Sequence, residues 1–194
     1  LLKNNNRLIC VAKLNRPKFR DPKHSLKPVV ERLREYLPDN EITLVDDFLT
    51  CDPHIFKDQK PGEILVLENI RFYPKEKDYS TIFAKKLSSL ADVYVNDGFA
   101  VSHRTDTSVI GPPKFIPGYG GLLLKKELEM LTSVIKNHKK PIVAIIGGAK
   151  VTTKIGLINK LVKMVDYLII GGGLANTFVC AQGLEVGTSF CEYE

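Results

Sequence analysis

The apolar residues of this chain change their period repeatedly along its length. Short runs rich in β-branched residues predict buried strands over residues 7–14, 41–45, 63–67 and 92–97. Between them, apolar side chains recur every three or four positions and predict helices after Ser25 and Ser80, with Ser25 as the cap of the first. Strands that alternate with helices are typical of a parallel sheet with crossover helices.

This alternation is interrupted at residues 109–121, where three prolines and four glycines predict a loop or a segment boundary. A longer amphipathic helix is expected next, with one apolar stripe formed by Leu124, Leu128, Leu131 and Ile135. The chain then resumes as a strand–helix–strand unit followed by another helix, over residues 142–146, 153–165 and 167–170 and from Leu174.

The predicted fold class is α/β, with two Rossmann-like parallel-sheet lobes joined by a helix. We expect the first lobe over residues 1–121, the interdomain helix over 122–137 and the start of the second lobe over 138–194. Two strands and two helices form a thin core, so the second lobe is expected to be incomplete.

Composition narrows the class of protein. With 44% hydrophobic and 26% charged residues, the chain is typical of a soluble globular protein, and its apolar runs are too short to span a bilayer. The first residues do not have the order of a secretory signal, and the four cysteines are too scattered for a metal finger, which favours free thiols in the cytoplasm. The net charge of +6 favours anionic partners: phosphorylated metabolites, nucleotides or nucleic acid.

Arginines follow three of the predicted strands. Arg16, Arg71 and Arg104, the last beside His103, come just after strand ends. Because ligands of parallel α/β sheets lie outside the carboxyl ends of the strands, these side chains are expected to converge on a small, highly charged anion. The alternative is that each arginine pairs with a local carboxylate, among which Asp46, Asp47, Glu68 and Asp97 are candidates.

The second lobe carries two glycine turns. In GGAKVTTK, residues 147–154, the glycines allow close approach of a ligand, Lys150 stands in the turn, and Lys154 is expected on the first turn of the next helix. The next strand ends in Gly171, Gly172 and Gly173, which predicts a second turn beside the first. These features suit a polyphosphate, although the spacing is not that of a Walker P-loop and such turns are also ordinary strand endings.

Other chemistries lack their usual residues. The four histidines have no metal-binding spacing, and no serine stands in a nucleophile elbow. Asp46 and Asp47 could bind a metal or cap the following helix. We therefore predict no metal site formed by these residues alone.

Several segments resemble the phosphoglycerate kinase family, in the family's order and across essentially the whole chain. These segments are DPKHSLKPVVERL, VDDF, PGEILVLENIRFYP, FAKKLSSLADVYVNDGFAVSHR, KKEL, GGAKVTTKIGLI and IGGGLANTF. The resemblance implies reversible phosphoryl transfer between 1,3-bisphosphoglycerate and MgADP, giving 3-phosphoglycerate and MgATP. It also implies a glycerate-binding first lobe, a nucleotide-binding second lobe, hinge closure, and a cytoplasmic monomer of glycolysis that acts on neither nucleic acid nor membrane.

The resemblance also assigns residues. Lys154 and Lys150 are implied to be catalytic, because they would neutralise charge on the phosphoryl oxygens. The implied glycerate-binding residues are Lys13, Leu14, Asn15, Arg16, Arg71, His103 and Arg104. The implied nucleotide-binding residues are Gly148, Ala149, Lys150, Lys154, Gly171, Gly172 and Gly173.

The chain departs from the family pattern at a few positions. Lys13 replaces a histidine, and Asn15 replaces a glycine in a place where asparagine tolerates the left-handed conformation. Asp106 replaces a second histidine and is expected to add negative charge near the anion site. The pair Pro112 and Pro113 is expected to stiffen the hinge.

Two regions of the family are expected to lie outside these residues: the first strand of the glycerate lobe, and the remainder of the nucleotide lobe with its acidic Mg²⁺ ligand. The isolated chain is therefore expected to be inactive. Two other interpretations stay open: a non-catalytic anion-binding relative, and an unrelated nucleotide-binding α/β protein, which would not explain the ordered motifs.

Overall fold

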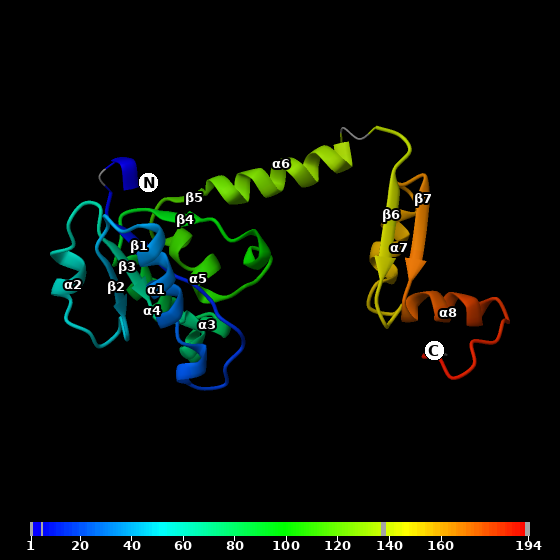
Figure 1. The fold of residues 1–194 in the computed structure, drawn as a ribbon, viewed down its shortest axis with the longest axis horizontal. Coiled ribbons are helices and arrows are strands. Elements are labelled where there is room, and N and C mark those ends of the chain that lie inside the picture. The colour runs from blue at the N-terminus through cyan, green and yellow to red at the C-terminus, as the bar shows by residue number, and fades with distance from the viewer. Residues whose placement is uncertain (1, 5, 137–138, 193–194) are drawn as a thin grey trace. The chain divides into compact units, whose positions relative to one another are not determined.

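The computed structural model describes residues 2–4, 6–136 and 139–192. These residues form two compact units, one within residues 1–128 and the other within 129–194, and the division falls inside the helix α6 (Leu122–Lys136). Figure 1 shows the two units with their elements labelled. The helix begins at the residue expected for the interdomain helix, whereas residue 137, its expected end, lies outside the described residues.

The first unit contains most of the secondary structure. Its strands are β1 (Leu8–Cys10), β2 (Ile42–Val45), β3 (Ile64–Leu67), β4 (Tyr94–Asn96) and β5 (Gly118–Gly120). Its α-helices before α6 are α1 (Lys27–Tyr36), α2 (His54–Lys57), α3 (Pro74–Lys77), α4 (Thr81–Ser88) and α5 (Thr107–Ile110). Short 3-10 turns occur at Leu2–Asn4, Pro22–His24, Ile70–Phe72, Phe99–Val101 and Pro112–Lys114.

The main sheet of this unit is parallel, as predicted, with the order β1-β3-β2. All four residues of the central strand β3 are buried, and their side chains alternate between the two faces. Ile64 and Val66 pack with Val30 of α1, whereas Leu65 and Leu67 pack with Phe83 of α4 in a separate cluster. A strand buried on both faces needs a helix on each side, which explains its continuous apolar sequence.

The segment 109–121, expected to be a loop or a segment boundary, contains regular structure. Gly118–Gly120 forms β5, which pairs in parallel with β4, so that Tyr94 lies opposite Gly118. The prolines form a 3-10 turn at Pro112–Lys114 instead of an open loop. Proline has the φ value that such a turn needs, and glycine in β5 needs no space for a side chain. The proline- and glycine-rich composition is therefore compatible with a turn and a strand as well as with a loop.

Two predicted elements are shorter in the structure. The strand expected over 7–14 ends at Cys10, because its pairing with β3 ends there and the chain then leaves the sheet. The helix expected over 153–165 is α7, which covers only Ile155–Leu161. Both differences lie at element ends, where an apolar pattern continues beyond the hydrogen-bonded residues.

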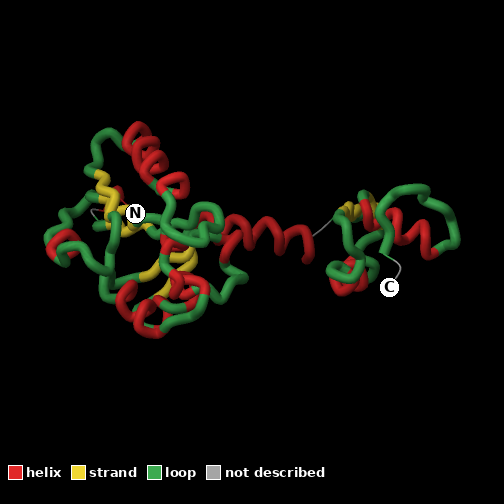
Figure 2. Tube along the Cα trace, turned by 90° about the horizontal axis from the view of Figure 1, so that it is seen from below, coloured by secondary structure: helices red, strands yellow, loops and turns green. Residues whose placement is uncertain are grey.

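The second unit contains β6 (Val143–Gly147), α7, β7 (Tyr167–Gly171) and α8 (Gly173–Ala181), and its two strands are parallel (Figure 1). Figure 2 distinguishes the helices, strands and loops of each unit by colour. Ile146 of β6 is buried with Ile158 of α7 and Leu174 of α8. On the other face, Ile145 is 77% exposed and Ile169 is 52% exposed. The two-stranded sheet is therefore covered by helices on one face only.

Among the described residues, no helix has both the length and the apolar composition that a membrane crossing requires.

Candidate functional site

The segments after β1 and β3 meet at the carboxyl ends of these neighbouring strands. Cys10 of β1 pairs with Val66 of β3, and the guanidinium of Arg71 donates a hydrogen bond to the carbonyl of Asn15. Arg71 is thereby held beside the residue that precedes Arg16. The structure thus brings together two of the three arginine-bearing segments, while the convergence of all three arginines on one anion stays a prediction.

A buried asparagine, which the sequence patterns did not single out, connects these segments. The Asn69 side chain is fully buried, and its Oδ1 accepts from the backbone N–H of Leu14 at 3.2 Å and of Arg71 at 3.2 Å. Its Nδ2 donates to the carbonyls of Leu14 at 2.8 Å and His24 at 2.9 Å. Its position two residues after the end of the buried strand β3 was the available signal, because a polar residue at such a place must find partners.

The loop after β1 contains a left-handed residue. Asn15 has a φ of +52° and is the only non-glycine residue with positive φ among those the structure describes. The expectation that asparagine supplies this conformation in place of glycine is confirmed. Its side chain also lies 3.2 Å from Nδ1 of His24.

The carboxylates that could have paired with the arginines have other partners. Glu68 accepts from Ser25 Oγ at 2.5 Å and from the backbone N–H of Leu26 at 2.7 Å, at the start of α1, where Leu26 rather than Ser25 is the N-cap residue. Ser25 Oγ still accepts from the N–H of Lys27 at 3.1 Å. The α1 cap therefore needs both the predicted serine and a distant glutamate.

The remaining three carboxylates also bind elsewhere. Asp46 pairs with Arg20, Asp47 accepts from the Tyr73 hydroxyl at 2.7 Å, and Asp97 accepts from the Leu124 N–H at 2.9 Å. Within the described residues, no ion pair involves the set Arg16, Arg71 and Arg104. Local charge pairing thus does not account for these arginines.

The third arginine, Arg104, has an unsatisfied donor. Its Nε is buried and has no hydrogen-bond partner within the part of the chain that the structure describes. A buried N–H of this kind costs free energy unless a ligand or water accepts from it. Arg16 and His103 are exposed, and Arg71 is half-buried.

Lys13 and Asp106, two of the departures from the family pattern, are partners in the structure. Lys13 Nζ lies 2.6 Å from Asp106 Oδ2 and 2.7 Å from Glu76 Oε1, with side-chain exposures of 10% for Lys13, 14% for Asp106 and 3% for Glu76. The negative charge expected at residue 106 is therefore met by Lys13 rather than presented unpaired to an anion.

The two glycine turns of the second unit lie side by side, as predicted. Gly147 pairs with Gly171, and the N–H of Leu174 donates to the carbonyl of Gly148 at 2.9 Å. Gly172 has a φ of +65°, and a Cβ atom there would lie 3.3 Å from the Gly148 carbonyl oxygen. This close packing of backbone requires glycine at residue 172.

The two lysines differ in their surroundings. Lys150 is exposed, whereas Lys154 is half-buried and its side chain lies over Gly148, with Cε 2.8 Å from the position that a Cβ would take. We expected Lys154 on the first turn of α7, but it immediately precedes this helix as its N-cap residue. Its N–H instead closes a turn to the Val151 carbonyl at 2.8 Å. Ala149 packs within 3.1 Å of the position that a Gly173 Cβ would occupy.

Glu192 binds the same loop. Its Oε2 accepts from the N–H of Val151 at 2.5 Å and of Thr152 at 3.1 Å, and its Oε1 accepts from Thr152 Oγ1 at 3.0 Å. Desolvation raises the pKa of Glu192, but these hydrogen bonds outweigh it and lower the pKa below its usual value. The backbone N–H groups of Val151 and Thr152, in the segment for which we expected a polyphosphate site, are thus bound by a carboxylate.

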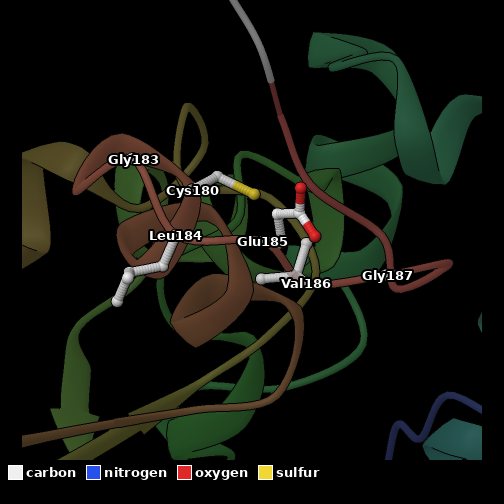
Figure 3. Close-up of a pocket in the computed structure, with 6 residues that line it drawn as sticks. All are labelled: Cys180, Gly183, Leu184, Glu185, Val186 and Gly187. Atoms are coloured by element: carbon white, nitrogen blue, oxygen red, sulfur yellow. The ribbon is translucent and has the colours of Figure 1, made fainter.

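A shallow hollow lies beyond α8, lined by Cys180, Gly183, Leu184, Glu185, Val186 and Gly187 (Figure 3). Its volume is about 410 Å³. The part of the chain that the structure describes, this hollow included, contains no group of three or more histidine, cysteine, aspartate or glutamate side chains that could hold a metal ion.

Comparison with known proteins decides the family. The family model described as phosphoglycerate kinase matches residues 1–194. The chain belongs to the phosphoglycerate kinase family. Structures agree: phosphoglycerate kinase from Coxiella burnetii matches with a TM-score of 0.82 at 35% identity, and that from Pyrococcus horikoshii OT3 with 0.79 at 28% identity. The two-lobe Rossmann-like fold is thereby confirmed.

The similarity covers nearly all of this chain and about half of its relatives. Phosphoglycerate kinase 3, cytosolic, of Arabidopsis thaliana is 46% identical over 99% of this chain and 48% of its own length. Phosphoglycerate kinase of Chloroflexus aurantiacus is 42% identical over 99% of this chain and 49% of its own length. The match to the Coxiella burnetii structure covers 99% of this chain, and the match to the Pyrococcus horikoshii OT3 structure covers 96% of it. Each match covers 48% of the other protein's length.

Proposed function

We propose that this chain supplies the glycerate-binding lobe, the interdomain helix and the start of the nucleotide lobe of a phosphoglycerate kinase. The reaction is reversible phosphoryl transfer between 1,3-bisphosphoglycerate and MgADP, which gives 3-phosphoglycerate and MgATP. Family membership supports this reaction, and arginines without an ion-pair partner among the described residues support an anionic substrate. The observation that carries the proposal is the buried Nε of Arg104, a donor without a partner among the described residues.

The arginines bind the anionic groups of the glycerate. Arg71 is oriented by the Asn15 carbonyl, and Arg16 belongs to the same loop. Guanidinium groups without carboxylate partners have donors available for a phosphate or a carboxylate, which they bind bidentately. In this proposal His103, Leu14 and Asn15 complete the surroundings of the substrate, as the family resemblance implies.

The second unit binds ADP and ATP. Gly148 and Gly172 of the adjoining turns are exposed residues, and a side chain at Gly171 would meet open space. Lys150 and Lys154 neutralise the phosphoryl oxygens, since this chemistry depends on positioning and electrostatics rather than on a covalent nucleophile. In this proposal Mg²⁺ enters with the nucleotide, and the family resemblance implies that its protein ligand lies outside these residues.

The setting follows from the same proposal. The protein acts in glycolysis in the cytoplasm. It is a monomer, and it binds metabolites rather than nucleic acid or membrane. Some relatives are named cytosolic and others chloroplastic, and the proposal takes the cytosolic relatives as the guide.

Calorimetric titration of the chain with 3-phosphoglycerate tests the proposal. We expect binding by the unmodified chain, and its loss in Arg71→Ala and Arg104→Met. Arg32→Ala is the matched control, because Arg32 is an exposed arginine of the same unit that pairs only locally with Glu35 and Tyr36. No heat of binding at millimolar ligand, or equal weakening by all three variants, would contradict a specific glycerate site.

A further inference from the structure

Lys13, Glu76 and Asp106 form a buried ion triad. Each of its residues comes from a segment that carries one of the three arginines. Lys13 belongs to the loop that continues to Arg16, and Asp106 follows Arg104 at the start of α5. Glu76 lies in α3, which follows the turn that contains Arg71. The ion pairs from Lys13 to both carboxylates therefore join the three arginine-bearing segments at one buried point.

The triad is anchored by further hydrogen bonds. Glu76 Oε2 accepts from the Ser108 N–H at 2.9 Å and Glu76 Oε1 from Ser108 Oγ at 2.7 Å. Thr107 Oγ1 donates to the Lys75 carbonyl at 2.6 Å and accepts from the Ser80 N–H at 3.1 Å. These bonds fix α3 against the start of α5, so Lys13 adds the loop after β1 to an already connected pair of elements.

The charge of the triad argues against a direct role in anion binding. One lysine and two carboxylates carry a net charge of −1, and the lysine donors face carboxylates at 2.6 and 2.7 Å. A buried ammonium held in this way is not available to a substrate phosphate without breaking a buried ion pair, which is costly. Any contribution to anion binding must therefore be geometric.

We propose that Lys13, Glu76 and Asp106 form a clamp that sets the spacing of Arg16, Arg71 and Arg104. The three residues of the clamp are positioning residues, and Lys13 does not itself contact the glycerate. This inference rests on the proposed function, because it concerns the same anion site. An anion that needs several guanidinium groups at once binds weakly when one of them is displaced. Part of the binding free energy is then used to bring the displaced group back into position.

The test is the affinity for 3-phosphoglycerate of the double variant Lys13→Met/Asp106→Asn. This variant keeps the net charge of the triad at −1, since Glu76 retains its charge and its bonds to Ser108, so a change in affinity reports geometry rather than charge. We expect affinity to fall about tenfold or more, whereas Lys13→Arg, which keeps a cationic donor, retains most of it.

Two controls separate the clamp from general effects. Lys27→Met removes an exposed lysine at the start of α1 and is expected to leave affinity unchanged. Leu87→Ala removes a buried side chain of α4 and lowers stability without touching the triad, so it shows what destabilisation alone does to binding. Affinity is measured at a temperature where circular dichroism shows each variant to be folded.

The possible results are distinct. If the unmodified chain binds 3-phosphoglycerate and the double variant binds equally well, the clamp is wrong and the proposed function stands. If the double variant loses no more affinity than Leu87→Ala, the clamp is also wrong, because its effect is then stability alone. If the unmodified chain does not bind, the proposed function and the clamp are both overturned.

Discussion

Lys13 Nζ lies 2.6 Å from Asp106 Oδ2, although the two residues are 93 positions apart in the sequence. Each of them replaces a histidine of the family pattern, and in isolation each substitution changes the charge of the site. Together they form an ion pair of low exposure, so the two departures compensate each other. A single ion pair of low exposure therefore couples the two positions.

This coupling predicts non-additive effects on stability. Lys13→Ala leaves two buried carboxylates without their cation and is expected to lose about 3 kcal/mol, whereas Asp106→Ala leaves Lys13 paired with Glu76 and is expected to lose less. The double variant is expected to lose less than the sum of the two, with a coupling of about 1 kcal/mol or more. Urea unfolding of the four proteins measures this cycle, and additive losses would contradict a pair that acts as a unit.

Asn69 is expected to be among the most sensitive polar residues of the first unit. Asn69→Ala removes four hydrogen bonds and leaves the N–H and carbonyl of Leu14 unsatisfied, so we expect a loss of about 3 kcal/mol and weaker binding of 3-phosphoglycerate. Urea unfolding and calorimetric titration measure the two effects. Asn159→Ala, an exposed asparagine of α7, is the matched control and is expected to change stability by less than about 0.5 kcal/mol.

The role of Asn69 also shows where the sequence stops being informative. Strand positions, the parallel sheet and the carboxyl-end position of the arginines follow from local apolar patterns and from chain topology, which one sequence contains. The partners of Asn69 lie up to 55 positions away, and those of Lys13 even further. Such contacts depend on how β3, α3 and α5 pack, and a local pattern does not contain that information.

The strand β5 was missed for a related reason. A glycine-rich segment has no apolar alternation, and Gly118–Gly120 owes its extended state to pairing with β4. The partners of Glu68 were equally hidden, since the carboxylate caps a helix that begins more than 40 positions earlier in the chain. In both cases the deciding term is tertiary pairing, which overrides the weak local preference.

Asn15 gives a test of backbone conformation alone. Its φ of +52° lies in the left-handed region, which glycine adopts freely and alanine does not. We expect Asn15→Gly to have nearly unchanged stability and Asn15→Ala to lose about 1 kcal/mol, as measured by urea unfolding. Equal effects of the two substitutions would show instead that the lost side-chain contact with His24 decides the stability.

Asp47 predicts a specific pH dependence of stability. Desolvation raises its pKa, but hydrogen bonds from the Tyr73 hydroxyl at 2.7 Å, the Leu49 N–H at 3.0 Å and the Thr50 hydroxyl at 2.9 Å outweigh it and hold the pKa below the usual 3.8. A lowered folded pKa means that the ionised carboxylate stabilises the fold above the unfolded pKa. This contribution is lost as the pH falls from 3.8 through the folded pKa.

The measurement compares the chain with Asp47→Asn by urea unfolding at several pH values. The stability difference between the two proteins is expected to be constant from about pH 6 to about pH 5, and to narrow below the unfolded pKa as the carboxylate of the unmodified chain becomes protonated. Tyr73→Phe removes the hydroxyl donor, so the stability difference measured in a Tyr73→Phe background is expected to narrow less. A difference that stays the same down to about pH 3 would mean that the pKa of Asp47 is not lowered by folding, because only a pKa that differs between the folded and unfolded states makes stability depend on pH.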